Sequence, residues 1–379
     1  MNPFSLLLVL AVAVTPLYPL RLTVIGVPFY LPELFISAAA VAWLVSWLTQ
    51  RLRPVSLPVR VVLPLLIFLI GALIATYQGG SESYGGLKSW VIFPLIFGYL
   101  SVQALAASTQ ARRNFEAGLF ISALIVSLWG IAEVVMSGGR LSSFFNSPNA
   151  AAMWLVPVLF VLLPSYRKSR LDQLGLVVIL IGVVLTQSFG GYLALGSGLL
   201  AWLIFSRAGA MFAIISSTVA LVLFSYLSLT KYLALAVTPL FGERLGGRLQ
   251  IWAMGRDAID SFGWLGFGPG RFESFYLSKV GMTFANPIEW NVPQPHNFYL
   301  ATWLSSGLIG LVGMLSLLVV LINDQLRNKQ FFLLAAVVAV VVHGLVDTTY
   351  WKNDLAIIFF LIVAMSVQPD RSLSTKSGA

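Results

Sequence analysis

The sequence lacks cysteine altogether, holds only two histidines and carries little charge. Without cysteine, the chain has no disulfides, no thiolate metal sites and no cysteine nucleophile. Charged residues make up 10% of the chain, against about 25% in an ordinary soluble domain. The polar chemistry of this protein must therefore come from few residues.

Apolar residues dominate what is present, at 58% of the chain. A water-soluble fold could not bury that much apolar surface, so the surrounding solvent is expected to be lipid. No polar stretch is long enough for a separate soluble domain, and residues 1–379 are predicted to form a single all-α, polytopic membrane domain. Apolar runs near the roughly 20 residues that cross a bilayer predict about twelve helices, at 4–20, 32–50, 61–77, 89–107, 115–136, 149–164, 173–187, 191–205, 210–229, 297–321, 330–346 and 354–368.

The distribution of Lys and Arg predicts the orientation of these helices. Thirteen basic residues fall in one set of alternate loops and four in the short loops of the opposite set. The positive-inside rule then places both termini in the cytoplasm. Because the net charge of +9 is explained by helix orientation, nucleic acid is not expected as a partner, whereas membrane lipids are.

One long loop, residues 230–296, is predicted on the outer, non-cytoplasmic face and holds the remaining six basic residues. A segment of that length crosses the membrane largely regardless of charge, so its arginines need another explanation. Arg244, Arg248 and Arg256 recur at multiples of four, which would align three guanidinium groups along one side of a helix.

Two interpretations of this arginine helix are open. It could lie at the membrane interface, with Leu249, Ala253 and Ile259 toward the lipid and its arginines on lipid phosphates. Alternatively, the arginines could clamp a diphosphate, because guanidinium forks match phosphate oxygens bidentately and stay charged at physiological pH.

Glycines crowd residues 263–270, directly before Arg271. Such a run permits tight turns or a close backbone approach. It lacks the Lys-Ser/Thr pair of a P-loop, so a structural turn is expected there rather than a phosphate cradle.

A shorter outer turn precedes the helix predicted at 149–164. Asn146 and Asn149 are expected to cap that helix. Arg140, at the start of the turn, could reach a bound anion.

The two histidines fall near the outer ends of predicted helices. His296 closes the long loop, and neutral imidazole is an effective general base near pH 7; a hydrogen-bonded structural role is the alternative. His343 lies one helical turn before Asp347, and a hydrogen bond between them would satisfy two polar groups that are costly in a membrane. A supporting role for this pair in a site is also open.

Several motifs follow one another in a recognisable order. The first is an R-x-S-x-x-F-x-N-P-N-like turn from Arg140, with Ser147 inserted before Pro148, and the second is G-R-x-x-x-W at Gly247, Arg248 and Trp252. Then come a G-x-G-x-G-x-F-like element at Gly266, Gly268, Gly270 and Phe272 and an H-N-x-Y-L element from His296 to Leu300. G-L-I-G from Gly307 to Gly310 and the His343–Asp347 pair complete the order. This order resembles the O-antigen ligase and polymerase superfamily, bacterial envelope proteins that act on undecaprenyl-diphosphate-linked glycans. The resemblance covers roughly residues 130–350.

The resemblance implies a C-type glycosyltransferase-like membrane fold and an enzyme of the bacterial cytoplasmic (inner) membrane. Its reaction would be an inverting, metal-independent transfer of a glycan from undecaprenyl diphosphate to an acceptor hydroxyl at the outer face, without a cofactor. The acceptor would be another glycan, lipid A core or another hydroxyl, so ligase, polymerase and protein glycosylase are all open.

The resemblance also implies roles for particular residues. His296 matches the residue that activates the acceptor hydroxyl, and Arg248 matches a diphosphate ligand. Asn297, Tyr299 and the His343–Asp347 pair would support them. The outer segments contain no Asp-x-Asp pair or histidine cluster, so no metal is expected.

The chain departs from the family pattern between the helices predicted at 173–187 and 191–205. The family often has Ser-Arg-Gly there, whereas this chain has Ser-Phe-Gly with Phe189 in the middle. Arg140, Arg244 and Arg256 are candidates to replace the missing diphosphate ligand, and Arg271 is a further one.

A secondary transporter of about twelve helices is the alternative from a different class of protein. Transporters place ionisable groups or broken helices near the bilayer midplane. The predicted spans hold almost no acidic residues, and Glu133 lies toward an outer end. No inverted repeat is evident, so the glycosyltransferase interpretation is preferred.

Overall fold

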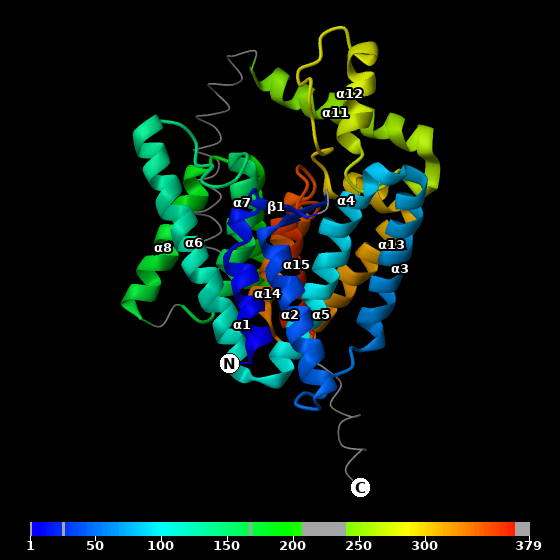
Figure 1. Ribbon diagram of the computed structural model, residues 1–379. Helices are drawn as coiled ribbons and strands as arrows, with labels where there is room; N and C mark the ends of the chain where they lie inside the picture. Colours follow the sequence, from blue (N-terminus) through cyan, green and yellow to red (C-terminus); the bar gives the residue numbers. More distant parts are fainter. Residues whose placement is uncertain (1, 25–26, 167–168, 207–239, 368–379) are drawn as a thin grey trace.

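The computed structural model describes residues 2–24, 27–166, 169–206 and 240–367, without the side chains of residues 24, 27 and 240–246. Helices stand side by side in a bundle, and two further helices, α11 and α12, lie beyond one end of it (Figure 1). We call that end the loop side. The span expected at 210–229 lies outside the described residues, whereas every other expected span overlaps a helix.

The elements follow one another along the chain without a layered sheet. The first half holds α1 (Pro3–Ala13), η1 (Thr15–Leu17), β1 (Arg21–Val24), β2 (Val27–Tyr30), α2 (Leu31–Leu48), α3 (Val59–Gly79), η2 (Ser81–Ser83), α4 (Tyr84–Leu87), the π-helical turn η3 (Lys88–Ile92), α5 (Phe93–Ala107), α6 (Thr109–Ser137), α7 (Pro148–Leu162) and α8 (Arg170–Leu185). The second half holds α9 (Phe189–Ser206), α11 (Leu240–Phe262), η4 (Gly263–Leu265), α12 (Phe272–Thr283), α13 (Phe298–Arg327), α14 (Phe331–His343) and α15 (Asn353–Ser366).

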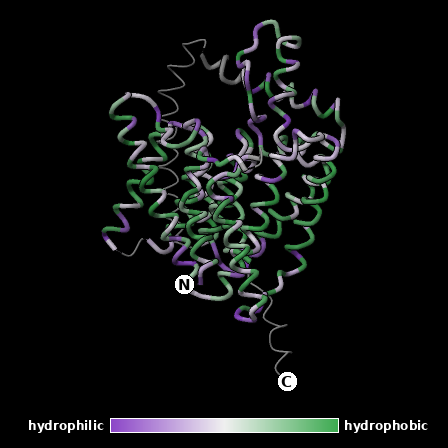
Figure 2. The backbone as a smooth tube through the Cα atoms, in the orientation of Figure 1, coloured by the Kyte–Doolittle hydropathy of each residue, from purple (hydrophilic) through white to green (hydrophobic). Residues whose placement is uncertain are grey.

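The lengths and composition of these helices fit a polytopic membrane protein. Six helical stretches in the described part of the chain are long and apolar enough to cross a membrane, and α1, α7, α14 and α15 are shorter apolar helices. Apolar residues fill the bundle, while hydrophilic ones gather at its ends and in the segment beyond the loop side (Figure 2). The all-α class and the membrane character are therefore confirmed.

One local feature departs from the all-α expectation. Strands β1 and β2 pair in an antiparallel manner, with Arg21 opposite Tyr30 and Leu22 opposite Phe29. The β-branched and aromatic residues of these short segments favour extended backbone. Lys88 ties these strands to the bundle, because its Nζ donates to the Pro28 carbonyl at 2.7 Å and pairs with the buried Glu33.

Small residues let the long helices α3 and α13 approach closely. A Cβ added at Gly71 would collide with the backbone of Gly310, and one added at Gly313 would collide with the backbone of Phe68. Close backbone approach through small residues drives helix association in membranes, where lipid removes the usual hydrophobic drive. The G-L-I-G stretch is part of this contact.

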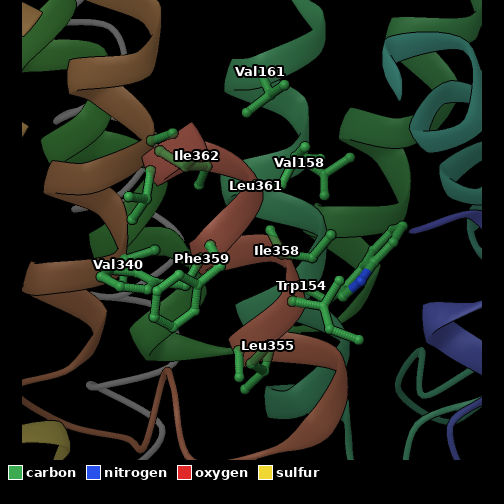
Figure 3. Packing of buried hydrophobic residues seen from close by; sticks show 14 of the residues in the cluster. Trp154, Val158, Val161, Val340, Leu355, Ile358, Phe359, Leu361 and Ile362 are labelled. Atoms are coloured by element: carbon green, nitrogen blue, oxygen red, sulfur yellow. The ribbon is translucent and has the colours of Figure 1, made fainter. Parts of the chain in front are cut away.

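The centre of the bundle is packed by α7, α14 and α15. Trp154 and Val158 of α7 face Leu355 and Ile358 of α15, and Val340 of α14 lies beside them (Figure 3). All five side chains are buried. This packing holds the end of α14 and the start of α15 in place, and Asp347 lies in the connection between them.

The segment beyond the loop side has a hydrophobic core of its own. Ile251, Met254 and Ala258 of α11 are buried with Tyr276 of α12 and Leu304 of α13. These are not the residues that one interpretation turned toward the lipid: of those, Ala253 and Ile259 are half-buried. Leu249, near the start of the helix, is exposed.

The glycine run attaches this segment to the bundle. Helix α13 is broken at Gly307, where φ is 67° and ψ is 178°, and the break frees the carbonyl of Leu304. The backbone N–H groups of Phe267 and Gly268 donate to that carbonyl at 2.9 and 3.3 Å. Gly266 has a φ of 70°, and a Cβ there would lie 2.7 Å from the same oxygen. The expected structural turn is therefore present, and it docks onto a kinked helix.

Candidate active site

His296 sits on a strained backbone at the junction of three elements. Its φ is +47°, a left-handed conformation that costs a non-glycine residue of the order of 1–2 kcal/mol. Its carbonyl accepts a hydrogen bond from Trp252 Nε1 of α11 at 3.4 Å. Strain of this kind persists only where surrounding contacts enforce it and often marks functional positions.

The residues after His296 fasten it to the end of α14. Asn297 caps α13, since its Oδ1 accepts from the Leu300 N–H at 2.9 Å, and its Nδ2 donates to the Leu345 carbonyl at 3.0 Å. Tyr299 Oη donates to the Val341 carbonyl at 3.1 Å. Asn297 and Tyr299 thus hold His296 against the connection between α14 and α15.

That connection supplies the partner of His296. Asp347 Oδ1 lies 2.9 Å from His296 Nδ1 and also accepts the Thr348 N–H at 2.8 Å. The side chains of His343 and Asp347 share no hydrogen bond: the Asp347 N–H donates to the His343 carbonyl at 3.0 Å, and the Asp347 carboxylate is turned toward His296. His296 is 29% exposed, whereas the Asp347 carboxylate is buried.

Opposing effects act on the pKa of His296. Burial lowers it, while the hydrogen bond and charge of Asp347 and the charge of Glu289 raise it, and the charge of Arg248 lowers it. The net result is a pKa above the usual value of 6.5. Because Asp347 stabilises the protonated ring, the imidazole is a strong proton acceptor whose charged form is tolerated.

His343 lies behind this pair, in contact with the start of α9. A Cβ added at Gly190 would lie 2.5 Å from His343 Nε2 and 3.1 Å from Val346 Cγ2. No hydrogen bond reaches the buried His343 Nε2 within the described residues. Gly190 follows Phe189, so the connection between α8 and α9, with its departure from the family pattern, borders the site. The Phe189 side chain is partly exposed.

Arg140 braces the same connection from the other side. Its Nε donates to the Thr186 carbonyl at 2.9 Å, and its Nη2 donates to the Gln187 carbonyl at 3.1 Å and to Asn149 Oδ1 at 3.2 Å. Arg140 is therefore brought to the connection that carries Phe189, with its guanidinium already engaged by backbone carbonyls.

The cap of α7 differs from the expectation. Ser147 is the N-cap, and its Oγ accepts the Ala150 N–H at 3.2 Å. Asn149 binds Arg140 instead, and Asn146 precedes the cap. Serine and asparagine are equally good caps, so position relative to Pro148, which prefers the first helical turn, decides between them. The inserted residue is thus the cap.

Arg248 and Arg256 project from α11 without partners among the described residues. Arg256 is exposed and Arg248 half-buried, and neither forms a hydrogen bond or ion pair within the ranges given above. Arg248 lies one helical turn before Trp252, whose Nε1 bonds the His296 carbonyl, and its charge lowers the pKa of His296. Two turns, about 12 Å of helix rise, separate the two arginines. Arg244 belongs to α11, but its side chain lies outside the described residues.

Arg271 is committed to the bundle rather than to the histidine. Its Nη1 donates to the Gly79 carbonyl and pairs with Glu82 Oε2 at 3.2 Å. It thereby fastens the start of α12 to the end of α3. The structure brings together Arg248, His296 and Asp347, with His343 behind and Arg140 across the α8–α9 connection, but it does not bring Arg271 to them.

Two residues that act on His296 were not assigned to the site from the sequence. Trp252 holds the His296 carbonyl, and its place in G-R-x-x-x-W was the only signal. Glu289 raises the pKa of His296, and no motif contains it. In the part of the chain that the structure describes, no three His, Asp or Glu side chains gather as a metal site would require.

Comparison with known families gives one match. Residues 174–315 match the family described as O-antigen ligase. The matched stretch runs from α8 to the middle of α13 and includes Arg248 and His296. No curated protein sequence matches the chain. The family match, together with the apolar helices, supports a multi-pass membrane protein with a glycosyltransferase-like ligase role. Over this part of the chain, the match supports membership of the O-antigen ligase superfamily.

Proposed function

We propose that the chain is a membrane enzyme that transfers a glycan from undecaprenyl diphosphate to an acceptor hydroxyl, with inversion at the anomeric carbon. The observation that carries this proposal is the His296–Asp347 pair, 2.9 Å apart, which the charge of Arg248 also reaches. A base and a cation at one place are what such a transfer needs, because the donor already carries a good leaving group.

In this proposal His296 is the general base. A carboxylate only accepts hydrogen bonds, so the neutral ring carries its proton on Nδ1 and donates it to Asp347 Oδ1. Nε2 is then the free acceptor for the proton of the incoming hydroxyl. Asp347 holds the tautomer and stabilises the imidazolium that forms, as an orienting carboxylate does in other histidine-based sites.

The transfer exchanges one C–O bond for another. The acceptor oxygen bonds to the anomeric carbon, the bond from that carbon to the diphosphate oxygen breaks, and its electron pair leaves with undecaprenyl diphosphate. The hydroxyl proton passes to His296 Nε2. Attack from the face opposite to the leaving group inverts the configuration, and a single base suffices for this direct displacement.

Arg248 is proposed as the main diphosphate ligand, because it is the unpaired arginine of α11 whose charge reaches His296. Arg256 extends the same cationic side of the helix and is proposed as a second contact. Arg140 and Arg271 already bind backbone carbonyls. We therefore propose that they hold the α8–α9 connection and the start of α12 in place, and that neither is the primary anion ligand. Because fixed arginines neutralise the leaving group, we propose a metal-independent reaction.

The membrane orientation follows from the distribution of basic residues. We propose that the loop side faces outward from the bacterial cytoplasmic membrane, with both termini in the cytoplasm. The described chain begins and ends at the opposite end of the bundle, where α1 starts and α15 finishes (Figure 1). Both ends would then share one side of the membrane.

Reconstitution into liposomes tests the activity directly. The purified chain is given undecaprenyl-diphosphate-linked glycan and separate acceptors, namely a second lipid-linked glycan and lipid A core, and products are identified by mass spectrometry. A glycan on either acceptor with inverted anomeric configuration supports the proposal. Glycan uptake into the vesicles without any transfer product would instead favour a transporter and would overturn it.

Glycan analysis of a deletion strain separates the two acceptor classes. Single repeat units on lipid A would identify the chain as a polymerase, because ligation then proceeds without chain growth. Long chains left on undecaprenyl diphosphate would identify it as a ligase. Unchanged surface glycans of both kinds would count against either role.

A further inference from the structure

The segment that leads to His296 is held rigidly by two helices. The Ile288 N–H donates to Gln250 Oε1 of α11 at 3.0 Å. The Glu289 carbonyl accepts from Tyr276 Oη of α12 at 2.7 Å. Residues 288 and 289 are thus fixed to both helices of the outer segment, and the side chain that follows is presented from a backbone with little freedom.

That side chain is Trp290, and it is 62% exposed. A Cβ added at Gly281 of α12 would lie 3.2 Å from Trp290 Cζ3, so one part of the ring rests on a glycine. The rest of the ring lies open. Tryptophan is usually well buried, and a large, open ring on a rigid backbone is typical of a binding surface because little conformational entropy is lost on contact.

A carboxylate comes one residue earlier in the chain: Glu289 Oε1 would lie 3.6 Å from a Cβ added at Gly247 of α11. Glu289 is exposed and forms no hydrogen bond or ion pair with its side chain within the described residues. Lipid headgroup phosphates would be repelled by this carboxylate, whereas sugar hydroxyls would donate to it. An open aromatic face with a free carboxylate on the preceding residue suits a pyranose ring, whose C–H face is apolar and whose rim is polar.

The segment continues from this surface to the proposed base. Val292 is buried in the outer core, and Gln294 Nε2 donates to the Trp351 carbonyl at 3.3 Å, in the connection that also holds Asp347. His296 follows two residues later. Helices α11 and α12 lie beyond the ends of the bundle helices, which places this surface away from the hydrocarbon core (Figure 1).

We propose that Trp290 and Glu289 form a carbohydrate subsite, in which the open indole face stacks on a pyranose ring and the carboxylate accepts its hydroxyls. This inference rests on the proposed glycan transfer and adds the residues that hold the sugar. The ring bound there belongs to the donor glycan or to a glycan acceptor, which share this chemistry.

The test compares Trp290→Ala and Trp290→Phe with Trp264→Ala. Trp264 is the matched control, since it is 74% exposed in the same outer segment but lies on η4 beside the bundle. We expect Trp290→Ala to raise KM for one glycan substrate by about tenfold with little change in kcat. Trp290→Phe should restore most of the affinity, and Trp264→Ala should leave KM unchanged. A rise confined to the donor or to the acceptor identifies the source of the sugar.

Binding without turnover separates this inference from the proposed function. The probe is the free glycan released from its lipid carrier by mild acid, and saturation-transfer difference NMR on the full chain in detergent measures its binding. Loss of glycan signal in Trp290→Ala and its reduction in Glu289→Gln support the subsite even if no transfer is found. Wild-type glycan binding by Trp290→Ala, or a defect in membrane insertion alone, would overturn it.

Discussion

The bundle and the segment of α11 and α12 differ in how closely their helices pack and in how many of their polar and aromatic side chains stay available. In the bundle, α3 and α13 approach so closely that glycine backbones touch, and a large apolar core fills the space between the helices. In the outer segment, a small core of its own supports arginines and a tryptophan that are left without partners or open to solvent. Rigidity in the first region and unsatisfied groups in the second together make a site, because catalysis needs groups that are both fixed and available.

Arg248 gives the largest expected effect on activity in the outer segment. Arg248→Ala should lower the transfer rate by about 10²–10³-fold, since it removes the cation that stabilises the leaving diphosphate. Arg248→Lys should recover only part of this loss, because a point charge cannot replace the bidentate fork. Steady-state rates with lipid-linked donor measure both. The melting temperature of both variants should hardly change. A clearly lower melting temperature would show that Arg248 also stabilises the fold, which would contradict the distinction between the two regions.

Asp347 links the two regions, and its change should appear in the pH profile. The raised pKa of His296 means that transfer by the neutral ring is lost as pH falls through that value. Asp347→Asn removes the hydrogen bond and charge that raise it, so the acid limb of kcat should move to lower pH. The rate at the optimum should also fall, by about 10–100-fold. An acid limb that stays in place would show that Asp347 does not tune His296.

Gly313 gives the smallest effect, and its effect should fall on stability alone. Gly313→Ala forces a Cβ into the backbone of Phe68, and overpacking of this kind costs about 1–3 kcal/mol. Gly196→Ala in α9 is the control, because a Cβ there meets nothing within 4 Å. Thermal unfolding in detergent should show a lower melting temperature for Gly313→Ala only. Equal melting temperatures would mean that α3 and α13 are not packed as tightly as described.

Sequence alone predicted the helices well, because the length of an apolar run is set by the bilayer rather than by tertiary contacts. It also made His296 and Arg248 candidates for the site, since a motif keeps chemistry-bearing residues at fixed places. The antiparallel pair of β1 and β2 was missed because these short strands are flanked by long apolar runs that dominate any hydropathy pattern.

The partners within the site could not be read from spacing. A separation of four residues suggested a hydrogen bond between the side chains of His343 and Asp347, but only the Asp347 N–H reaches His343, at its carbonyl, and the carboxylate binds His296. The pairing of Asp347 with His296 joins residues 51 positions apart in the chain. Such contacts depend on how the ends of α13 and α14 pack together, and the residue pattern within a single helix does not reveal that packing.

Replacement of His296 tests the central claim most directly. His296→Asn and His296→Gly both tolerate the left-handed backbone at this position, so neither adds strain as alanine would. We predict that both fold normally and lose glycan transfer from undecaprenyl diphosphate, and that free imidazole restores part of the rate to His296→Gly alone. Wild-type transfer by either variant without imidazole would contradict the assignment of His296 as the base.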